Sequence, residues 1–244
     1  GAERHPEQRF ASLAELYQLA EAVPRRYRAL VLTAGLAGLR LGELSALRRR
    51  DVDLRGATVT VRRKRIRLAS GEVIEDDPKS EAGKRRVALP APLVTELEQH
   101  LREYGVPVAD AHIFTSSTGE PLERSNFRNR VWIPATRDTG LEGLRWHDLR
   151  HTAGTLAART GATTKEIMAR LGHASPRAAM MYQHASEDRD RLIADRLTAM
   201  ALEAGVVPAS AAPDPSVPPG DHSAGARLGH EPGPHADAEG GSGR

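Results

Sequence analysis

The chain has 244 residues, of which 39% are hydrophobic and only 4% aromatic, so one substantial domain must build its core from Leu, Val, Ile and Ala. The absence of Cys excludes disulfides and thiolate metal sites, residues 1–10 lack the pattern of a signal peptide, and no long uncharged apolar run occurs in the sequence. The formal charge of +3 becomes +7 over residues 1–200 once the net −4 of residues 201–244 is set aside. We therefore expect a cytoplasmic protein whose basic surface either binds a polyanion or is simply solvated.

The N-terminal part of the chain predicts helices. Ser12 and Glu15 fit a capping box at the start of a first helix with leucines at helical spacing. Pro24 separates it from a second apolar helix, which Gly35 and Gly38 are expected to end.

In the middle of the chain, the spacing of apolar residues changes from that of helices to that of strands. After a short helix over residues 42–48, segments 58–68, 73–74 and 86–89 predict three short strands of an antiparallel meander, with turns at 69–72 and 78–83. Further helices are expected after Pro92 and over residues 124–139, 147–160, 163–171, 176–183 and 187–204. The fold class is therefore mostly α with a small three-stranded antiparallel β-sheet (α+β).

The domain organisation follows from composition. Residues 1–204 are expected to form one compact domain. Residues 205–244 are rich in Pro, Gly, Ala and Ser, and cannot bury enough apolar surface to offset the entropy of ordering. We expect this segment to be a disordered tail.

Chemistry-bearing residues occur in four short motifs. They are G-L-R-L-G-E-L at 38–44, H-D-L-R-H-T at 147–152, L-G-H at 171–173, and Tyr182. His147 and His151 imitate the spacing of the H-E-x-x-H zinc motif, but Asp replaces Glu and Arg150 between them opposes a dication. A zinc hydrolase is therefore a weak alternative, and we expect neither a metal nor another cofactor.

In order and spacing, these motifs resemble the catalytic domain of the tyrosine recombinase (phage integrase) family. The family order is Arg, Lys, His-x-x-Arg, His or Trp, and Tyr. Here His147 precedes Arg150 by three residues, His173 follows 23 residues later, and Tyr182 nine residues after that. The resemblance extends over residues 10–204 and implies the fold of the DNA breaking-rejoining catalytic core.

The chemistry itself calls for these residue types. A phosphodiester under in-line attack gains charge on its non-bridging oxygens, and fixed guanidiniums neutralise that charge without metal. We assign Arg40 and Arg150 to this task and a phosphate hydrogen bond to His173. Tyr182 is the predicted nucleophile. His147 shares a helix face with Arg150 and is the candidate base.

Two supporting assignments follow. The resemblance implies that a lysine on the turn between the second and third strands protonates the leaving 5′ oxygen, which points to Lys79 in Pro78-Lys79-Ser80, with Lys84 as the competitor. Glu43 is expected to orient an arginine or, equally, to stabilise the start of its helix.

A run of cations follows the first strand. It could track DNA phosphates, or it could be the solvated face of an edge strand. The residues expected to bind DNA are Arg62, Arg63, Lys64, Arg65 and Lys84, with Arg67 nearby.

The resemblance implies a site-specific DNA recombinase that forms a 3′-phosphotyrosyl intermediate without ATP. Expected partners are double-stranded DNA attachment sites, an excisionase or a host DNA-bending factor, and three further copies in a homo-tetramer on DNA. The chain is expected to be monomeric when free, nucleoid-associated when bound, and encoded by a prophage or mobile element. The alternatives are a type IB topoisomerase-like enzyme and a non-cutting DNA-binding relative. An N-terminal core-binding domain is expected to be absent from this chain.

Overall fold

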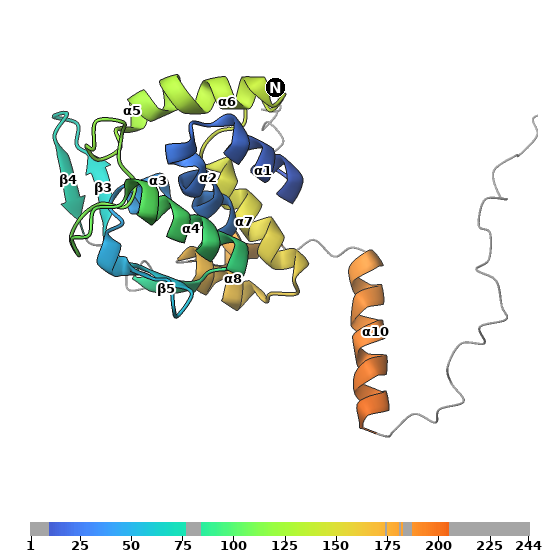
Figure 1. The fold of residues 1–244 in the computed structure, drawn as a ribbon. Coiled ribbons are helices and arrows are strands. Elements are labelled where there is room, and N and C mark those ends of the chain that lie inside the picture. The colour runs from blue at the N-terminus through green and yellow to red at the C-terminus, as the bar shows by residue number, and fades with distance from the viewer. Residues whose placement is uncertain (1–9, 77–83, 174, 181, 183–186, 205–244) are drawn as a thin grey trace, which may run out of the picture. The chain divides into compact units, whose positions relative to one another are not determined.

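The computed structural model describes residues 10–76, 84–173, 175–180, 182 and 187–204, the last stretch mainly through its backbone (Figure 1). The chain divides into two units, residues 1–185 and 186–244, and the described part of the second is helix α10 (Glu187–Glu203) with Ala204. The predicted tail and Lys79 both lie outside the described residues.

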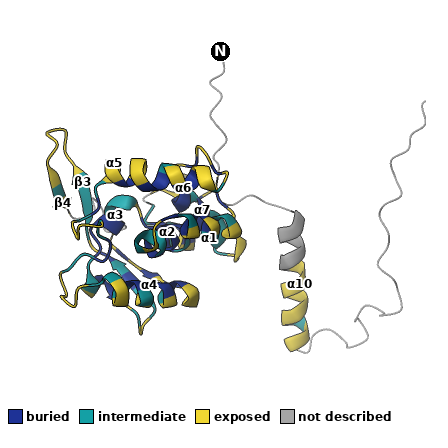
Figure 2. Cartoon of the chain, turned by 45° about the horizontal axis from the view of Figure 1, so that its top comes forward, coloured by how far each residue is buried: buried dark blue, intermediate teal, exposed yellow. Residues whose placement is uncertain are grey.

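Helix α2 (Arg25–Ala37) lies at the centre of the first unit. It packs against α1 (Leu13–Ala22), α4 (Ala91–Tyr104) and α7 (Asp148–Arg159), and most of its residues are buried (Figure 2). The capping box predicted for α1 is present, because Ser12 Oγ accepts from the Glu15 amide at 3.2 Å while the Glu15 carboxylate accepts from the Ser12 amide at 2.7 Å.

The prediction that Gly35 would end α2 was wrong. Gly35 lies inside the helix, where a Cβ atom would collide with the Leu16 side chain of α1. The absence of a side chain at Gly35 lets α1 and α2 approach closely. The helix ends at Gly38, whose φ of 73° is the left-handed conformation that glycine adopts without strain.

The strands form two sheets. One is three-stranded and antiparallel, in the order β1 (Val52–Asp53), β2 (Thr58–Val61), β5 (Arg85–Ala88). The other pairs β3 (Lys64–Arg67) with β4 (Val73–Asp76). The predicted single strand over 58–68 was therefore wrong, because β2 pairs directly with β5, where Val59 faces Val87, and β3 pairs with β4. The β2–β5 pairing joins segments distant in sequence, whereas β3 and β4 pair across the turn predicted at 69–72.

Apart from the short 3-10 helix over residues 49–51, which was not predicted, the remaining helices agree with the predicted regions within a few residues, and the predicted fold class is confirmed. No helix in the described part of the chain is long and apolar enough to cross a membrane. The other elements are α3 (Leu41–Ser45), η1 (Arg49–Asp51), α5 (Arg124–Phe127), the π-helical η3 (Arg128–Trp132), α6 (Ile133–Asp138), α8 (Thr164–Leu171) and α9 (Pro176–Met180).

Candidate active site

Two glycine caps bring distant helix ends together. Gly38 ends α2 and Gly172 ends α8, both in the left-handed conformation. A Cβ atom on Gly38 would collide with the side chain of Leu171, so the two ends lie against each other. The carbonyl groups at these ends are not used by the helices and are available to side-chain donors.

Arg150, in the first turn of α7, binds both ends. Its Nη1 donates to the Gly38 carbonyl at 2.6 Å, and its Nη2 donates to the Leu171 carbonyl. The residue is only 3% exposed. Burial, followed by the charge of Arg40, lowers the pKa of Arg150 to about 9, which still leaves the guanidinium protonated at neutral pH. Arg150 is thus a fixed buried cation.

Arg40 caps α3 and is held by Glu43. The Glu43 carboxylate accepts from the Arg40 amide at 2.8 Å and from Arg40 Nη1 at 3.0 Å, while Arg40 Nη2 lies 3.5 Å from the Gly172 carbonyl. The Arg40 side chain remains 42% exposed. Arg40 therefore presents its charge to solvent beside the buried Arg150.

Glu43 is buried and has a second cationic partner. Arg85, on β5, donates from Nη1 and Nη2 to the two carboxylate oxygens at 3.0 and 2.9 Å. Burial alone would raise the pKa of Glu43, but the hydrogen bonds and charges of Arg85 and Arg40 lower it. Two guanidiniums, those of Arg40 and Arg85, thus share the Glu43 carboxylate, and with the nearby Arg150 the cluster keeps an excess of positive charge.

The Tyr182 side chain packs beside this arginine cluster. It is 8% exposed, its ring lies against the backbone of Gly154, and a Cβ atom there would be 2.6 Å from Tyr182 Cζ. The His173 and Tyr182 rings are nearly parallel, at 15°, with centroids 6.2 Å apart. The Tyr182 hydroxyl lies 2.9 Å from His151 Nδ1. Burial raises the pKa of Tyr182, against the opposing charges of Arg150 and Arg40.

The histidines of the site are held in the neutral form. Desolvation, and then the charges of Arg150 and Arg40, lowers the pKa of His173 to about 4. Partial desolvation, followed by the charge of His151, lowers the pKa of His147, which caps α7. Desolvation also lowers the pKa of His151. At neutral pH all three imidazoles can therefore accept one proton and donate another.

A cleft of about 1110 Å³ adjoins this cluster, with Arg40 and His147 on its wall. It lies between α3 and β3 on one side and α5, η3 and α6 on the other, and Phe127, Trp132 and Trp146 line its apolar part. Its cationic lining consists of Arg40, Arg65, Arg67, Arg124, Arg128, Arg137 and Arg145.

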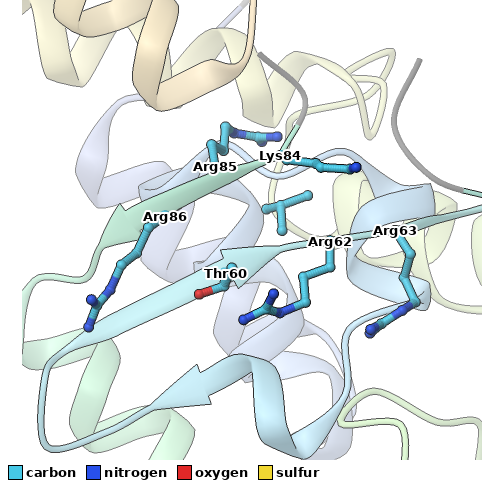
Figure 3. A pocket seen from close by; sticks show the side chains of 7 residues that line it. Thr60, Arg62, Arg63, Lys84, Arg85 and Arg86 are labelled. Carbon is cyan, nitrogen blue, oxygen red and sulfur yellow. The ribbon is translucent and has the colours of Figure 1, made fainter. Parts of the chain in front are cut away.

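The predicted DNA-binding cations lie in two places. Arg62, Arg63 and Lys84 line a second, smaller cleft of about 480 Å³ beside β2 and β5, together with Arg86 (Figure 3). Arg63 is largely buried and donates to Asp51 at 2.6 Å, so it also stabilises the fold.

The other two cations belong to β3. Lys64 lies 3.7 Å from Asp76, and Arg65 lines the larger cleft.

The zinc alternative lacks a ligand set. No group of three or more His, Asp or Glu side chains placed for one metal ion occurs among the described residues, whereas catalytic zinc takes three protein ligands. Asp148, the acid of the motif, instead accepts from the Arg145 amide at 2.8 Å and from its guanidinium at 2.9 Å.

Sequence reasoning missed two residues of the cluster, Arg85 and His151. Arg85 alternates with Val87 along a strand, so it stands on the buried face of β5, and this inward cation was a readable signal. His151 was considered only as a zinc ligand, although it lies one helical turn after His147 and directly follows Arg150.

Comparisons with known proteins identify relatives of this chain. A sequence model described as the phage integrase family matches residues 9–189. A protein of Mycobacterium tuberculosis, provisionally named as the phiRv2 prophage integrase, is 40% identical over 193 residues, covering 78% of this chain and 51% of the relative. The integrase of Mycobacterium phage D29 is 37% identical over 197 residues, covering 80% of this chain and 52% of the phage protein. The chain thus spans about half the length of these relatives.

Among solved structures, the integrase of transposon Tn1549 in complex with transposon right-end DNA superposes with a TM-score of 0.67 at 18% identity. The match covers 81% of this chain and 69% of that one. At this identity the likeness concerns the fold.

Proposed function

Because the chain belongs to the phage integrase family, whose members are tyrosine recombinases, we propose that it is the catalytic domain, residues 1–204, of a site-specific DNA recombinase. In this proposal Tyr182 Oη attacks a backbone phosphorus and forms a 3′-phosphotyrosyl link with release of a 5′-hydroxyl. A 5′-hydroxyl from another strand reverses the step. The bond energy stays in the covalent link, so the reaction needs no ATP.

The observation that supports this proposal most is the meeting of Arg40, Arg150, His173 and Tyr182 at the paired ends of α2 and α8. Guanidiniums are always charged at neutral pH and bind phosphate oxygens with two parallel donors. We assign Arg40 and Arg150 to the non-bridging oxygens of the scissile phosphate, where the charge develops in the transition state.

His173 suits a neutral donor to the same phosphate. Its Nδ1 is buried and has no hydrogen-bond partner among the described residues, which costs free energy that a phosphate oxygen would recover. We propose that His147 donates a hydrogen bond to the same phosphate from the side of the larger cleft. The proton for the leaving oxygen is assigned to Lys79, with Lys84 as the competitor.

The substrate proposed is double-stranded DNA. The excess positive charge at the cluster and the arginine-lined cleft beside it suit a phosphate backbone, and the similar Tn1549 integrase was solved with DNA. Arg62, Arg63, Lys64, Arg65 and Lys84 are proposed to contact flanking phosphates. We also propose assembly as a homo-tetramer on DNA from free monomers, with an excisionase or DNA-bending factor as a further partner.

The test is covalent capture. Purified protein is incubated in EDTA with nicked suicide duplexes that carry candidate attachment sites, and the products are separated under denaturing conditions. The proposal predicts a protein–DNA adduct from the wild type and none from Tyr182→Phe. A longer version of the protein is tested beside this chain, because the relatives are about twice as long.

The rivals give other results. A type IB topoisomerase-like enzyme relaxes supercoils in one duplex without joining strands of two sites, and the similarity to named integrases makes it the less favoured reading. A non-cutting relative shifts DNA in a gel but forms no adduct. A zinc hydrolase is silent in EDTA.

A further inference from the structure

The hydroxyl of Tyr182 has a histidine partner that the sequence did not assign to the reaction. Tyr182 Oη and His151 Nδ1 lie 2.9 Å apart, within the range of a hydrogen bond that can pass a proton. His151 stands on α7, directly after Arg150, which is proposed to bind the phosphate. Among the described residues it is His151, not His147, that contacts the phenol.

We propose that His151 is the general base of cleavage: its Nδ1 takes the phenolic proton as Tyr182 Oη bonds to phosphorus. This inference rests on the proposed function. The Oη–P bond forms, the P–O5′ bond breaks, and the leaving oxygen takes its proton from the separate acid. On rejoining, the 5′-hydroxyl attacks phosphorus, and Oη leaves and recovers its proton from His151.

The surroundings of His151 suit a base. The residue is half-buried, and partial desolvation keeps its imidazole neutral in the resting enzyme. On its own helix it faces Asp148, which favours the imidazolium, and Arg150, which opposes it, and Arg145 opposes it from the preceding loop. The carboxylate of Asp148 thus offsets part of the cost of a transient positive charge.

Other rings pack around the His151–Tyr182 pair. The His147 ring meets the His151 ring edge-on at 5.3 Å, and the His173 ring stacks with the Tyr182 ring at a centroid distance of 6.2 Å. The Gly154 backbone lies against the tyrosine ring and leaves no room for a Cβ atom. The phenol is therefore confined with its hydroxyl against His151, which is the proximity that a proton transfer requires.

The roles of the two α7 histidines then separate. His147, at the exposed cap of the helix, is a phosphate donor on the cleft side, and His151, one turn further on, activates the nucleophile. The base assigned to His147 from the sequence is replaced in this proposal by its neighbour, because both lie on the same helix face but only His151 contacts Tyr182.

The experiment measures single-turnover cleavage against pH with a 5′-bridging phosphorothiolate substrate, whose leaving group needs no acid. The rate then reports activation of Tyr182 alone. The variants are His151→Ala and His151→Asn. Asparagine keeps a hydrogen-bonding atom near the position of Nδ1 but takes up no proton, so it rescues a positioning role and not a base.

We expect both variants to cleave about 10² to 10⁴ times more slowly at neutral pH, with unchanged DNA binding. The wild-type rate falls in acid as His151 protonates, whereas in His151→Asn the rate instead climbs steadily with pH as hydroxide takes over. Added imidazole restores part of the activity of His151→Ala. Wild-type cleavage rates and pH profile in His151→Asn would overturn the proposal.

A second measurement does not depend on the folding of a variant. Replacement of the four tyrosines by a fluorotyrosine lowers the pKa of the phenol but not that of an imidazole. If His151 is the base, the pH at which the cleavage rate falls in acid does not change. A fall that shifts with the pKa of the phenol contradicts the proposal, and a wild type that forms no adduct at all removes the proposed function as well.

Discussion

Glu43 and Arg85 form a buried bidentate ion pair that joins α3 to β5, with both guanidinium Nη atoms within 3.0 Å of the carboxylate oxygens. The same carboxylate holds Arg40. Because Arg85 already neutralises the Glu43 carboxylate, Glu43 can hold Arg40 in place while the positive charge of Arg40 stays uncompensated. The ion pair therefore links the stability of the fold to the geometry of the proposed phosphate site.

The first prediction concerns this pair. Glu43→Gln leaves Arg85 buried without its counter-charge, so we expect the free energy of unfolding to fall by about 3–5 kcal/mol and cleavage to fall as Arg40 loses its support. Urea denaturation and suicide-substrate cleavage measure the two effects. Glu98→Gln, at an exposed position of α4, is the matched control. An unchanged unfolding free energy in Glu43→Gln would show that the pair is not needed.

The second prediction concerns Arg150. Lysine keeps the charge but loses the planar fork that binds two helix ends and is proposed to bind a phosphate. We expect Arg150→Lys to lower the cleavage rate on the order of 10² to 10³-fold, the usual cost of one transition-state donor. Arg159→Lys, at the exposed end of the same helix, should cleave like the wild type. Equal rates in the two variants would contradict the role of Arg150.

The third prediction concerns the approach of α3 to β3. A Cβ atom on Gly42 would lie 2.6 Å from the backbone oxygen of Arg65. Backbone cannot rotate away as a side chain can, so Gly42→Ala should destabilise the fold by about 1–3 kcal/mol. Thermal unfolding measures the loss. A variant with the wild-type melting temperature would mean that α3 and β3 separate easily.

The fourth prediction follows from the lowered pKa of His173, about 4 against 6.5 for an ordinary histidine. Between these values the unfolded chain binds more protons than the folded one, so the free energy of unfolding falls as the pH drops from about 6.5. Urea denaturation at several pH values should show this fall and a shallower one in His173→Gln. The same slope in both proteins would mean that His173 does not titrate in this way.

Local signals predicted much of this structure, and long-range contacts account for what they missed. The capping box at Ser12 and the helix end at Gly38 depend on neighbours in sequence, and both were predicted. Gly35 was misread because the Leu16 side chain that requires it belongs to another helix. Strand β2 pairs with β5, a segment far away in sequence, and this pairing was missed, whereas β3 and β4 pair across the short turn that was predicted at 69–72.

The same distinction between local signals and long-range contacts applies to the candidate site. Arg40, His147, Arg150, His173 and Tyr182 were predicted from order and spacing, and the fold brings them together. Arg85 and His151 act through contacts with Glu43 and Tyr182, at separations of 42 and 31 residues. Such contacts have no period in the sequence and become visible only when the helix ends meet.

The most direct test of the account is to identify the residue that bonds to DNA. After cleavage of a suicide duplex, nuclease and trypsin digestion followed by mass spectrometry locates the attached nucleotide. Trypsin separates peptide 171–177, which holds His173 and Ser175, from peptide 178–189, which holds Tyr182. We expect a nucleotide on Tyr182, attached through its 3′-phosphate. Attachment to any other residue, or through a 5′-phosphate, would contradict it.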